Sequence, residues 1–166
     1  MSANDRPPPG KTAATASTPR LDIAHQVLAA LEQAQIVAAL GGSGLLAALG
    51  LTQQVRDWDV TTDADPMAVQ AALSMACLAF SVVGAGEGGF ATRARFLIDA
   101  GDHEVDLIVG FAFREGPDVV ALPTRVTGQW RGLPLGDPAV WARAYELMGR
   151  RQQAASLRTW LNRREG

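Results

Sequence analysis

The stretch from residue 36 to residue 61 constrains the fold of this chain more than any other. The apolar run 36–40 predicts a buried strand, and it ends abruptly in Gly41-Gly42-Ser43. Residues 45–49 then resume as a short helix that stops at Gly50, and a second extended run covers 57–61. A strand that turns at once into a helix and is followed by another strand is typical of mixed α/β proteins.

The rest of the sequence continues this mixture. Further helices are expected from Asp22 onward, over 66–76, over 137–147 and over 151–161. Further extended runs occupy 80–83, 92–98 and 104–111, with a hairpin turn at 99–102 and another extended pair within 118–131. There are no internal repeats. The order predicts an α/β (α+β) fold with a largely antiparallel or mixed sheet flanked by helices.

Length and composition fit one domain. The chain has 166 residues and 48% of them are hydrophobic, which is material for a single core. Residues 1–20 carry prolines and small polar residues and cannot bury enough apolar surface to become ordered. We therefore expect a disordered tail over 1–20 and a single domain over 21–166. The tail also lacks the hydrophobic segment of a secretory signal.

Composition also excludes several classes of function. Cys77 is the only cysteine, which excludes an internal disulfide and a cysteine-based zinc site, and two histidines are too few for a histidine metal cage. No apolar run approaches the ~20 residues that span a bilayer, so we expect a cytoplasmic protein with no membrane partner. The net charge of -2 and the lack of a basic block exclude a long nucleic-acid track.

Two aspartates open the second extended run. Because side chains alternate across a strand, Asp57 and Asp59 should point to the same face, with Trp58 on the other. Neighbouring carboxylates repel each other, and a divalent cation between them reverses that repulsion. Oxygen-only ligands of this kind favour Mg²⁺ or Mn²⁺ over zinc. Two solvated acids at the end of a strand would give the same Asp-x-Asp pattern, so the pair alone does not decide.

Asp106 and the glycine turn favour the metal interpretation. Asp106 lies inside the apolar run 105–109, where a carboxylate is unfavourable unless it pairs with a positive group. A third ligand to the same metal would explain it, and Glu104, on the same face, is the competing candidate. Gly41-Gly42-Ser43 provides a turn where backbone N–H groups can approach a phosphate, although an ordinary strand-to-helix turn has the same composition.

Together these residues resemble the DNA polymerase beta-type nucleotidyltransferase superfamily. Its pattern is a hydrophobic residue with Gly-Gly or Gly-Ser, then a hydrophobic-flanked Asp-x-Asp after a short helix, then a distal Asp. Here residues 40–43 supply the first part, 57–60 the second and 105–107 the third. The chain looks particularly like the small bacterial members, some of which are toxins of abortive-infection or toxin–antitoxin systems. The resemblance covers residues 21–111 and, more loosely, the helices from 137 onward.

The resemblance implies metal-dependent transfer of a nucleoside monophosphate from a nucleoside triphosphate, such as ATP, to an acceptor hydroxyl. The residues that it makes catalytic and metal-binding are Asp57, Asp59 and Asp106, with Asp106 either completing the shell of a second Mg²⁺ (or Mn²⁺) or acting as general base. The residues that it assigns to the phosphates are Gly41, Gly42 and Ser43. The acceptor, whether small molecule, protein or RNA, is not indicated.

The basic residues depart from the family pattern. No lysine lies in the expected domain, so Arg56, Arg93 or Arg95 would have to grip the triphosphate. We expect Arg150 and Arg151, at the start of the last helix, to lie on a solvated face. Gln152 and Gln153 stand where the family would lead us to look for a Lys-Asp pair, so that pair has no counterpart here.

Two competing interpretations remain. The fold could serve as a non-catalytic nucleotide-binding or protein-interaction module, for instance one partner of a toxin–antitoxin pair, and the same motifs would remain. The glycine cluster 83–89 resembles a dinucleotide-binding fingerprint, which requires a helix directly after it. Residues 92–98 look extended instead, so we interpret the cluster as a loop beside the nucleotide site.

Overall fold

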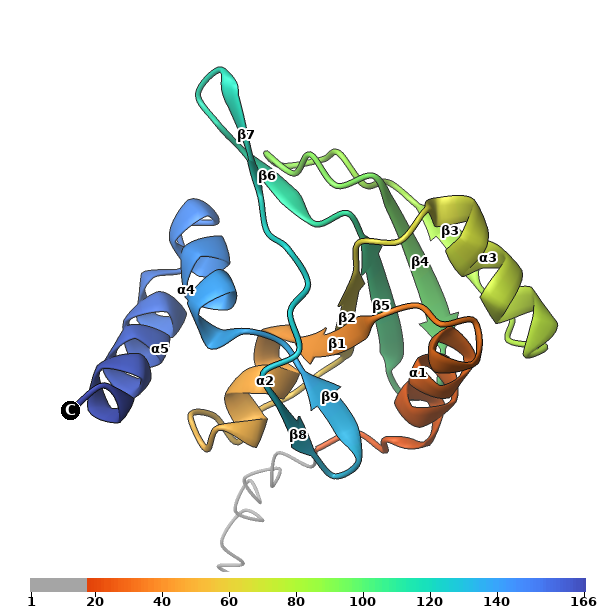
Figure 1. Ribbon diagram of the computed structural model, residues 1–166, viewed down its shortest axis with the longest axis horizontal. Coiled ribbons are helices and arrows are strands. Elements are labelled where there is room, and N and C mark those ends of the chain that lie inside the picture. Colours follow the sequence, from red (N-terminus) through yellow and green to blue (C-terminus); the bar gives the residue numbers. More distant parts are fainter. Residues whose placement is uncertain (1–17) are drawn as a thin grey trace, which may run out of the picture.

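The computed structural model describes residues 18–166 (Figure 1). Most of the expected tail, residues 1–17, lies outside the described residues. The helices are α1 Asp22–Gln33, α2 Gly42–Ala48, α3 Pro66–Met75, α4 Pro138–Leu147 and α5 Arg151–Arg164. The strands are β1 Ala38–Gly41, β2 Trp58–Thr62, β3 Ser81–Val83, β4 Ala94–Asp99, β5 Glu104–Val109, β6 Ala112–Glu115, β7 Asp118–Ala121, β8 Gly128–Trp130 and β9 Leu133–Leu135.

Seven of these strands form one mixed sheet, which confirms the predicted fold class. Their order is β3-β4-β5-β2-β1-β9-β8. Strand β2 runs parallel to β5 and β1 runs parallel to β9, while the other neighbours are antiparallel. The hairpin predicted at residues 99–102 joins β4 to β5, and there the Asp99 carboxylate accepts a hydrogen bond from Gly101 N–H.

The extended pair predicted within 118–131 corresponds to β7 and β8, but these two strands do not pair with each other. The structure has two hairpins instead, β6–β7 outside the main sheet and β8–β9 at its edge. Glycines with positive φ mark both turns, Gly116 at 59° and Gly132 at 77°. Such φ values build the tight turns that fit the twist of paired strands. One turn lies just before the segment 118–131 and the other just after it, so β7 pairs with the preceding β6 and β8 pairs with the following β9.

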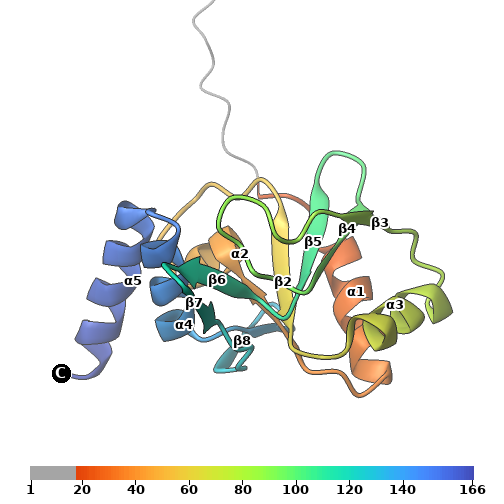
Figure 2. The ribbon, with the colours of Figure 1, turned by 90° about the horizontal axis from the view of Figure 1, so that it is seen from above.

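Alternate residues of the central strands face opposite sides of the sheet. One side carries Val60, Phe96, Val105 and Leu107, all nearly or fully buried. Helices α1 and α3 cover this side, while α4 and α5 lie on the other side of the molecule (Figure 2). Apolar residues of α1 and α3, such as Leu31 and Leu73, complete the core. Residues 18–166 contain no helix that is long and apolar enough to cross a membrane.

Candidate active site

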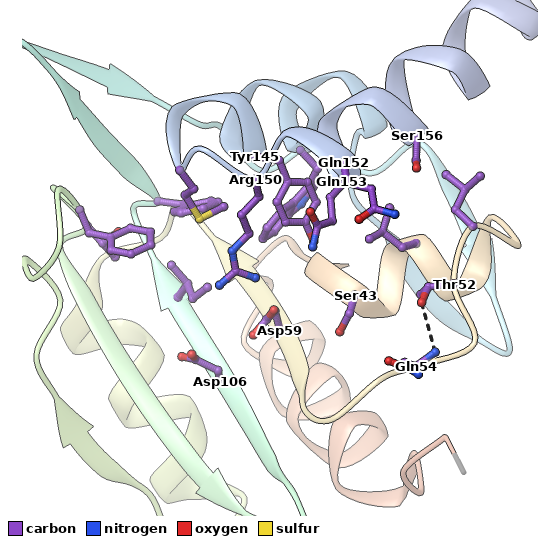
Figure 3. A pocket seen from close by; sticks show the side chains of 18 of the residues that line it. Ser43, Thr52, Gln54, Asp59, Asp106, Tyr145, Arg150, Gln152, Gln153 and Ser156 are labelled. Atoms are coloured by element: carbon purple, nitrogen blue, oxygen red, sulfur yellow. Dashed lines mark hydrogen bonds between the residues drawn. The ribbon is translucent and has the colours of Figure 1, made fainter. Parts of the chain in front are cut away.

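A cleft of about 560 Å³ lies between the sheet and the C-terminal helices. Its floor comes from the start of α2 and from β2, β4 and β5, and its roof comes from α4, α5 and the turn between them (Figure 3). Among its lining residues, four carry charge: Asp59, Asp106, Arg95 and Arg150. The cleft is the place where three of the six predicted site residues, Ser43, Asp59 and Asp106, meet.

The parallel pairing of β2 with β5 brings Asp59 and Asp106 together. The two residues are direct partners in the register, so their side chains share one face of the sheet. Val60 and Leu107, the next pair along, point into the core on the opposite face. The apolar residues that surround each aspartate in the sequence therefore serve the other side of the same strand.

Burial and neighbouring charge both act on Asp59. They raise the pKa of its carboxyl to about 7, first through desolvation and then through the negative charges of Asp106 and Asp57. The guanidinium groups of Arg95 and Arg150 oppose this shift. A cation placed between Asp59 and Asp106 would remove much of the repulsion that keeps the pKa high.

Gly42 lets Asp59 approach the backbone at the start of α2. Its φ is 56°, and a Cβ at this position would overlap Oδ2 of Asp59. Gly41 has a different role, because a Cβ there would overlap the indole ring of Trp141 on α4. Gly41 therefore makes room for the packing of α4 onto β1. The role in phosphate binding that the resemblance gave to Gly41 remains a prediction.

The structure separates Asp57 from the other two aspartates. Its Oδ1 accepts a hydrogen bond of 2.8 Å from the backbone N–H of Glu104, and it lines a neighbouring pocket beside His103 rather than the cleft. No three His, Cys, Asp or Glu side chains within residues 18–166 are grouped so that they could hold a metal ion. Two of the three predicted ligands thus line the cleft together, and Asp57 lines the neighbouring pocket.

Of the three arginines considered for the triphosphate, only Arg95 reaches the cleft. Its Nε donates to Oδ1 of Asp106 at 3.2 Å and its Nη2 donates to Oδ2 at 2.6 Å, while Nη1 donates to the carbonyl of Gly84. Arg95 therefore supplies the positive partner that a carboxylate inside an apolar strand requires, and it ties the glycine-rich loop to the site. Strand β4 follows this loop, which confirms that no dinucleotide-binding helix is present there.

Arg150 is exposed, as expected, but sequence reasoning missed its place at the cleft. It lines the cleft and points from the roof toward Asp59 (Figure 3). The turn that ends α4 sets its position: Gly149 has φ of 73° and donates to the Glu146 carbonyl, and Arg150 N–H donates to the Tyr145 carbonyl. Gly149 was the available signal, because glycine after an apolar helix predicts a reversal of direction at the next residue.

The C-terminal helices also add a neutral polar wall. Gln152, Gln153 and Ser156 of α5 line the cleft, opposite Thr52 and Gln54 from the loop after α2 (Figure 3). Amide side chains both donate and accept hydrogen bonds. The two glutamines that stand in place of the expected Lys-Asp pair therefore face the cleft as uncharged groups.

Solved structures with the same arrangement identify the fold. A crystal structure from Thermotoga maritima, provisionally described as a nucleotidyltransferase, superposes with a TM-score of 0.61 at 20% identity and covers 86% of this chain and 92% of its own. The chain has the nucleotidyltransferase fold. The antibiotic-resistance factor ANT(2″)-Ia, crystallised with adenylyl-2″-tobramycin, superposes with a TM-score of 0.55 at 17% identity and covers 84% of this chain and 87% of its own. No protein-family model and no curated protein matches the sequence.

Proposed function

We propose that this protein transfers a nucleoside monophosphate from a nucleoside triphosphate to an acceptor hydroxyl, in a Mg²⁺-dependent reaction. The observation that carries the proposal is the pairing of Asp59 with Asp106 across adjacent parallel strands, inside a cleft of the nucleotidyltransferase fold. The adenylylated tobramycin bound to ANT(2″)-Ia supports the same reaction type, since adenylylation joins a nucleotide to a hydroxyl.

The donor set fits a divalent cation in its chemistry. Asp59 and Asp106 offer only oxygen ligands, and a bound cation would offset the desolvation and the negative charges that raise the pKa of Asp59. A carboxylate has about four lone-pair sites, and Arg95 uses one on each oxygen of Asp106. The remaining sites can still bind a cation. Asp59 and Asp106 would therefore hold the ion, with Asp57 as a third ligand if it turns away from Glu104. A bound Mg²⁺ would neutralise charge on the triphosphate.

Residues of the chain would position the reactants. Ser43 and Arg150 face the cleft from its two walls and would bind phosphate oxygens by hydrogen bond and by charge. The acceptor oxygen attacks the α-phosphorus, the bond from this phosphorus to the bridging oxygen of the β-phosphate breaks, and pyrophosphate leaves. Where Asp106 acts as the general base and not as a ligand of the ion, the hydroxyl proton passes to its carboxylate, which Arg95 holds in place. Positioning and charge stabilisation would supply most of the rate.

Calorimetric titration tests this proposal. Each of the four common nucleoside triphosphates is titrated with and without Mg²⁺ into the wild type, Asp59→Asn and Asp57→Asn. We expect Mg²⁺-dependent binding of at least one nucleotide to the wild type and its loss in Asp59→Asn. The matched control is Asp118→Asn, an exposed aspartate on β7 outside the cleft, which should bind as the wild type does.

The same titration separates the alternatives. Loss of binding in Asp57→Asn would support a third metal ligand, and unchanged binding would restrict the metal site to Asp59 and Asp106. Binding without any product, over a panel of acceptors, would favour a nucleotide-binding module such as one partner of a toxin–antitoxin pair. No binding by the wild type would contradict the proposal and direct the search to a protein partner.

A further inference from the structure

The order of the strands divides the cleft into two halves. Along the sheet, β1 is followed by β2, β5 and β4, so the start of α2 lies on one side of Asp59 and Asp106 lies on the other. Beyond Asp106 come Arg95 on β4 and the residues just before that strand, Phe90 and Thr92. We call these the Ser43 half and the Phe90 half.

The Ser43 half holds most of the uncharged polar groups of the cleft, although Leu46 and Leu51 also line it. Thr52, Gln54, Gln152, Gln153 and Ser156 gather there around Ser43 (Figure 3). Hydroxyl and amide groups suit the phosphates, ribose and base edge of a nucleotide, which all form hydrogen bonds. The leaving pyrophosphate and the attacking oxygen lie on opposite sides of the α-phosphorus in an in-line displacement. A nucleotide in the Ser43 half therefore leaves the Phe90 half to the acceptor.

The Phe90 half combines apolar side chains with Thr92 and the guanidinium of Arg95, and within residues 18–166 no unpaired carboxylate lines it. Ile108 on β5 pairs with Arg95 on β4 in the register, and its side chain lies on the same face of the sheet as Asp106. Phe90 packs against Phe111 with ring centroids 6.2 Å apart, and both rings line the cleft. The one acidic group lining this half is Asp106, and Arg95 already neutralises it at 2.6 Å. Glu87 adds negative charge near Arg95 but does not line the cleft.

We infer that the acceptor in the proposed reaction is an uncharged hydroxyl compound that presents an aromatic or aliphatic face to Phe90, Phe111 and Ile108. This inference rests on the proposed function. A polycationic acceptor such as an aminoglycoside needs carboxylates for its several ammonium groups, whereas in this half the Asp106 carboxylate is already paired and the Arg95 guanidinium repels other cations. This acceptor class therefore differs from that of the adenylylated tobramycin found in complex with ANT(2″)-Ia.

Three probes test the acceptor class directly. The protein is first saturated with Mg²⁺ and the α,β-methylene analogue of the nucleotide that binds in the calorimetric titration, and the binding of phenyl β-glucoside, methyl β-glucoside and tobramycin is then measured. The two glucosides carry the same hydroxyls and differ only in the apolar group. We expect the phenyl compound to bind at least about tenfold more tightly than the methyl compound, and tobramycin to bind more weakly than either.

Variants locate the effect. Phe90→Ala should bring the affinities of the two glucosides within about threefold of each other and leave the affinity for the nucleotide analogue unchanged. The matched control is Phe80→Ala, which removes another half-buried ring, packed edge-on against Phe96 and outside the cleft, and should keep the phenyl preference. Ile108→Thr, which keeps the branched shape of a strand residue, gives the same readout if Phe90→Ala does not fold.

The outcomes separate this inference from the function on which it rests. Failure of the analogue to bind with Mg²⁺ would overturn both. With the analogue bound, equal affinities for the two glucosides, no glucoside binding or tightest binding of tobramycin would each overturn the acceptor class alone. A phenyl preference that persists in Phe90→Ala and Ile108→Thr would also overturn it, because the apolar group would then bind elsewhere.

Discussion

The two faces of the central sheet differ although the same strands build both. On the α1–α3 face, β2 and β5 contribute Val60, Val105 and Leu107, which are fully buried. On the cleft face, the intervening residues of the same strands include Asp59 and Asp106. The period of two along a strand thus lets one segment supply core packing and site chemistry independently.

This difference has an energetic consequence. Each side chain on the packed face stabilises the fold through burial of apolar area. On the cleft face, ionised Asp59 opposes folding, because burial and the charges of Asp106 and Asp57 disfavour its charged form. Stability and chemistry should therefore respond in opposite ways to substitutions on the two faces.

Substitution of Asp59 by Asn should give the largest effect. The change removes the central carboxylate of the cleft, and we expect nucleotidyl transfer to fall about a thousandfold or more, a barrier increase of roughly 4 kcal/mol. The same substitution removes a charge that is unfavourable in the folded state, so stability at pH 8 should be unchanged or higher. Steady-state pyrophosphate release and urea unfolding measure the two effects. Lost activity together with a clearly less stable variant would contradict the division between the faces.

Leu107→Ala should do the reverse. Leu107 is fully buried on the packed face, so truncation should lower the free energy of unfolding by about 2–5 kcal/mol through lost transfer energy and a cavity. At temperatures where the variant stays folded, its affinity for the nucleotide should match the wild type. Val119→Ala, an apolar truncation at a residue that is 56% exposed on β7, should change stability by less than about 0.5 kcal/mol. Weak nucleotide binding by folded Leu107→Ala would show that the faces are coupled.

The packed face was the more predictable of the two from sequence. Apolar runs predicted the central strands, and the apolar spacing around Val27 and Leu31 predicted α1. In these elements the residues that the sequence pattern predicts to be apolar and inward-facing are the residues that are buried in the fold. The hairpins after residue 111 were predicted poorly, because which strand pairs with which depends on turns at Gly116 and Gly132 and on contacts far along the chain.

The cleft was predictable only in its charged floor. A carboxylate inside an apolar strand singled out Asp106, and the adjacency of Asp59 follows from the parallel pairing of β2 with β5. The alternation of side chains along a strand predicted that Asp57 and Asp59 share one face. The strand begins only at Trp58, however, and the Asp57 carboxylate accepts a hydrogen bond from the Glu104 amide. Gly41 accommodates Trp141 from a helix 100 residues later. Such packing partners leave no local sequence signal.

The pH dependence of stability should distinguish the faces next. The pKa of Asp59 is raised from 3.8 in the unfolded chain to about 7 in the folded protein. The folded state therefore binds more protons between these values, and the free energy of unfolding falls as pH rises through the window, by roughly 4 kcal/mol over the whole window and about 2–3 kcal/mol between pH 5 and pH 8. Urea unfolding at pH 5 and pH 8 measures the change. Subtraction of the same change in Asp59→Asn isolates the group, and an equal change in both proteins would contradict the assignment.

Arg150 gives the smallest effect and refines the comparison on the cleft face itself, where two arginines have different partners. Arg95 is bound to both oxygens of Asp106, whereas Arg150 points toward Asp59 from the roof. If Arg150 binds the triphosphate, Arg150→Ala should weaken nucleotide affinity about tenfold, and Arg150→Lys should recover part of the loss because a point charge still attracts phosphate. Arg151→Ala, which changes the adjacent exposed arginine outside the cleft lining, is the matched control for net charge. Equal losses in Arg150→Ala and Arg151→Ala, measured by calorimetry at fixed ionic strength, would reduce the role of Arg150 to long-range attraction.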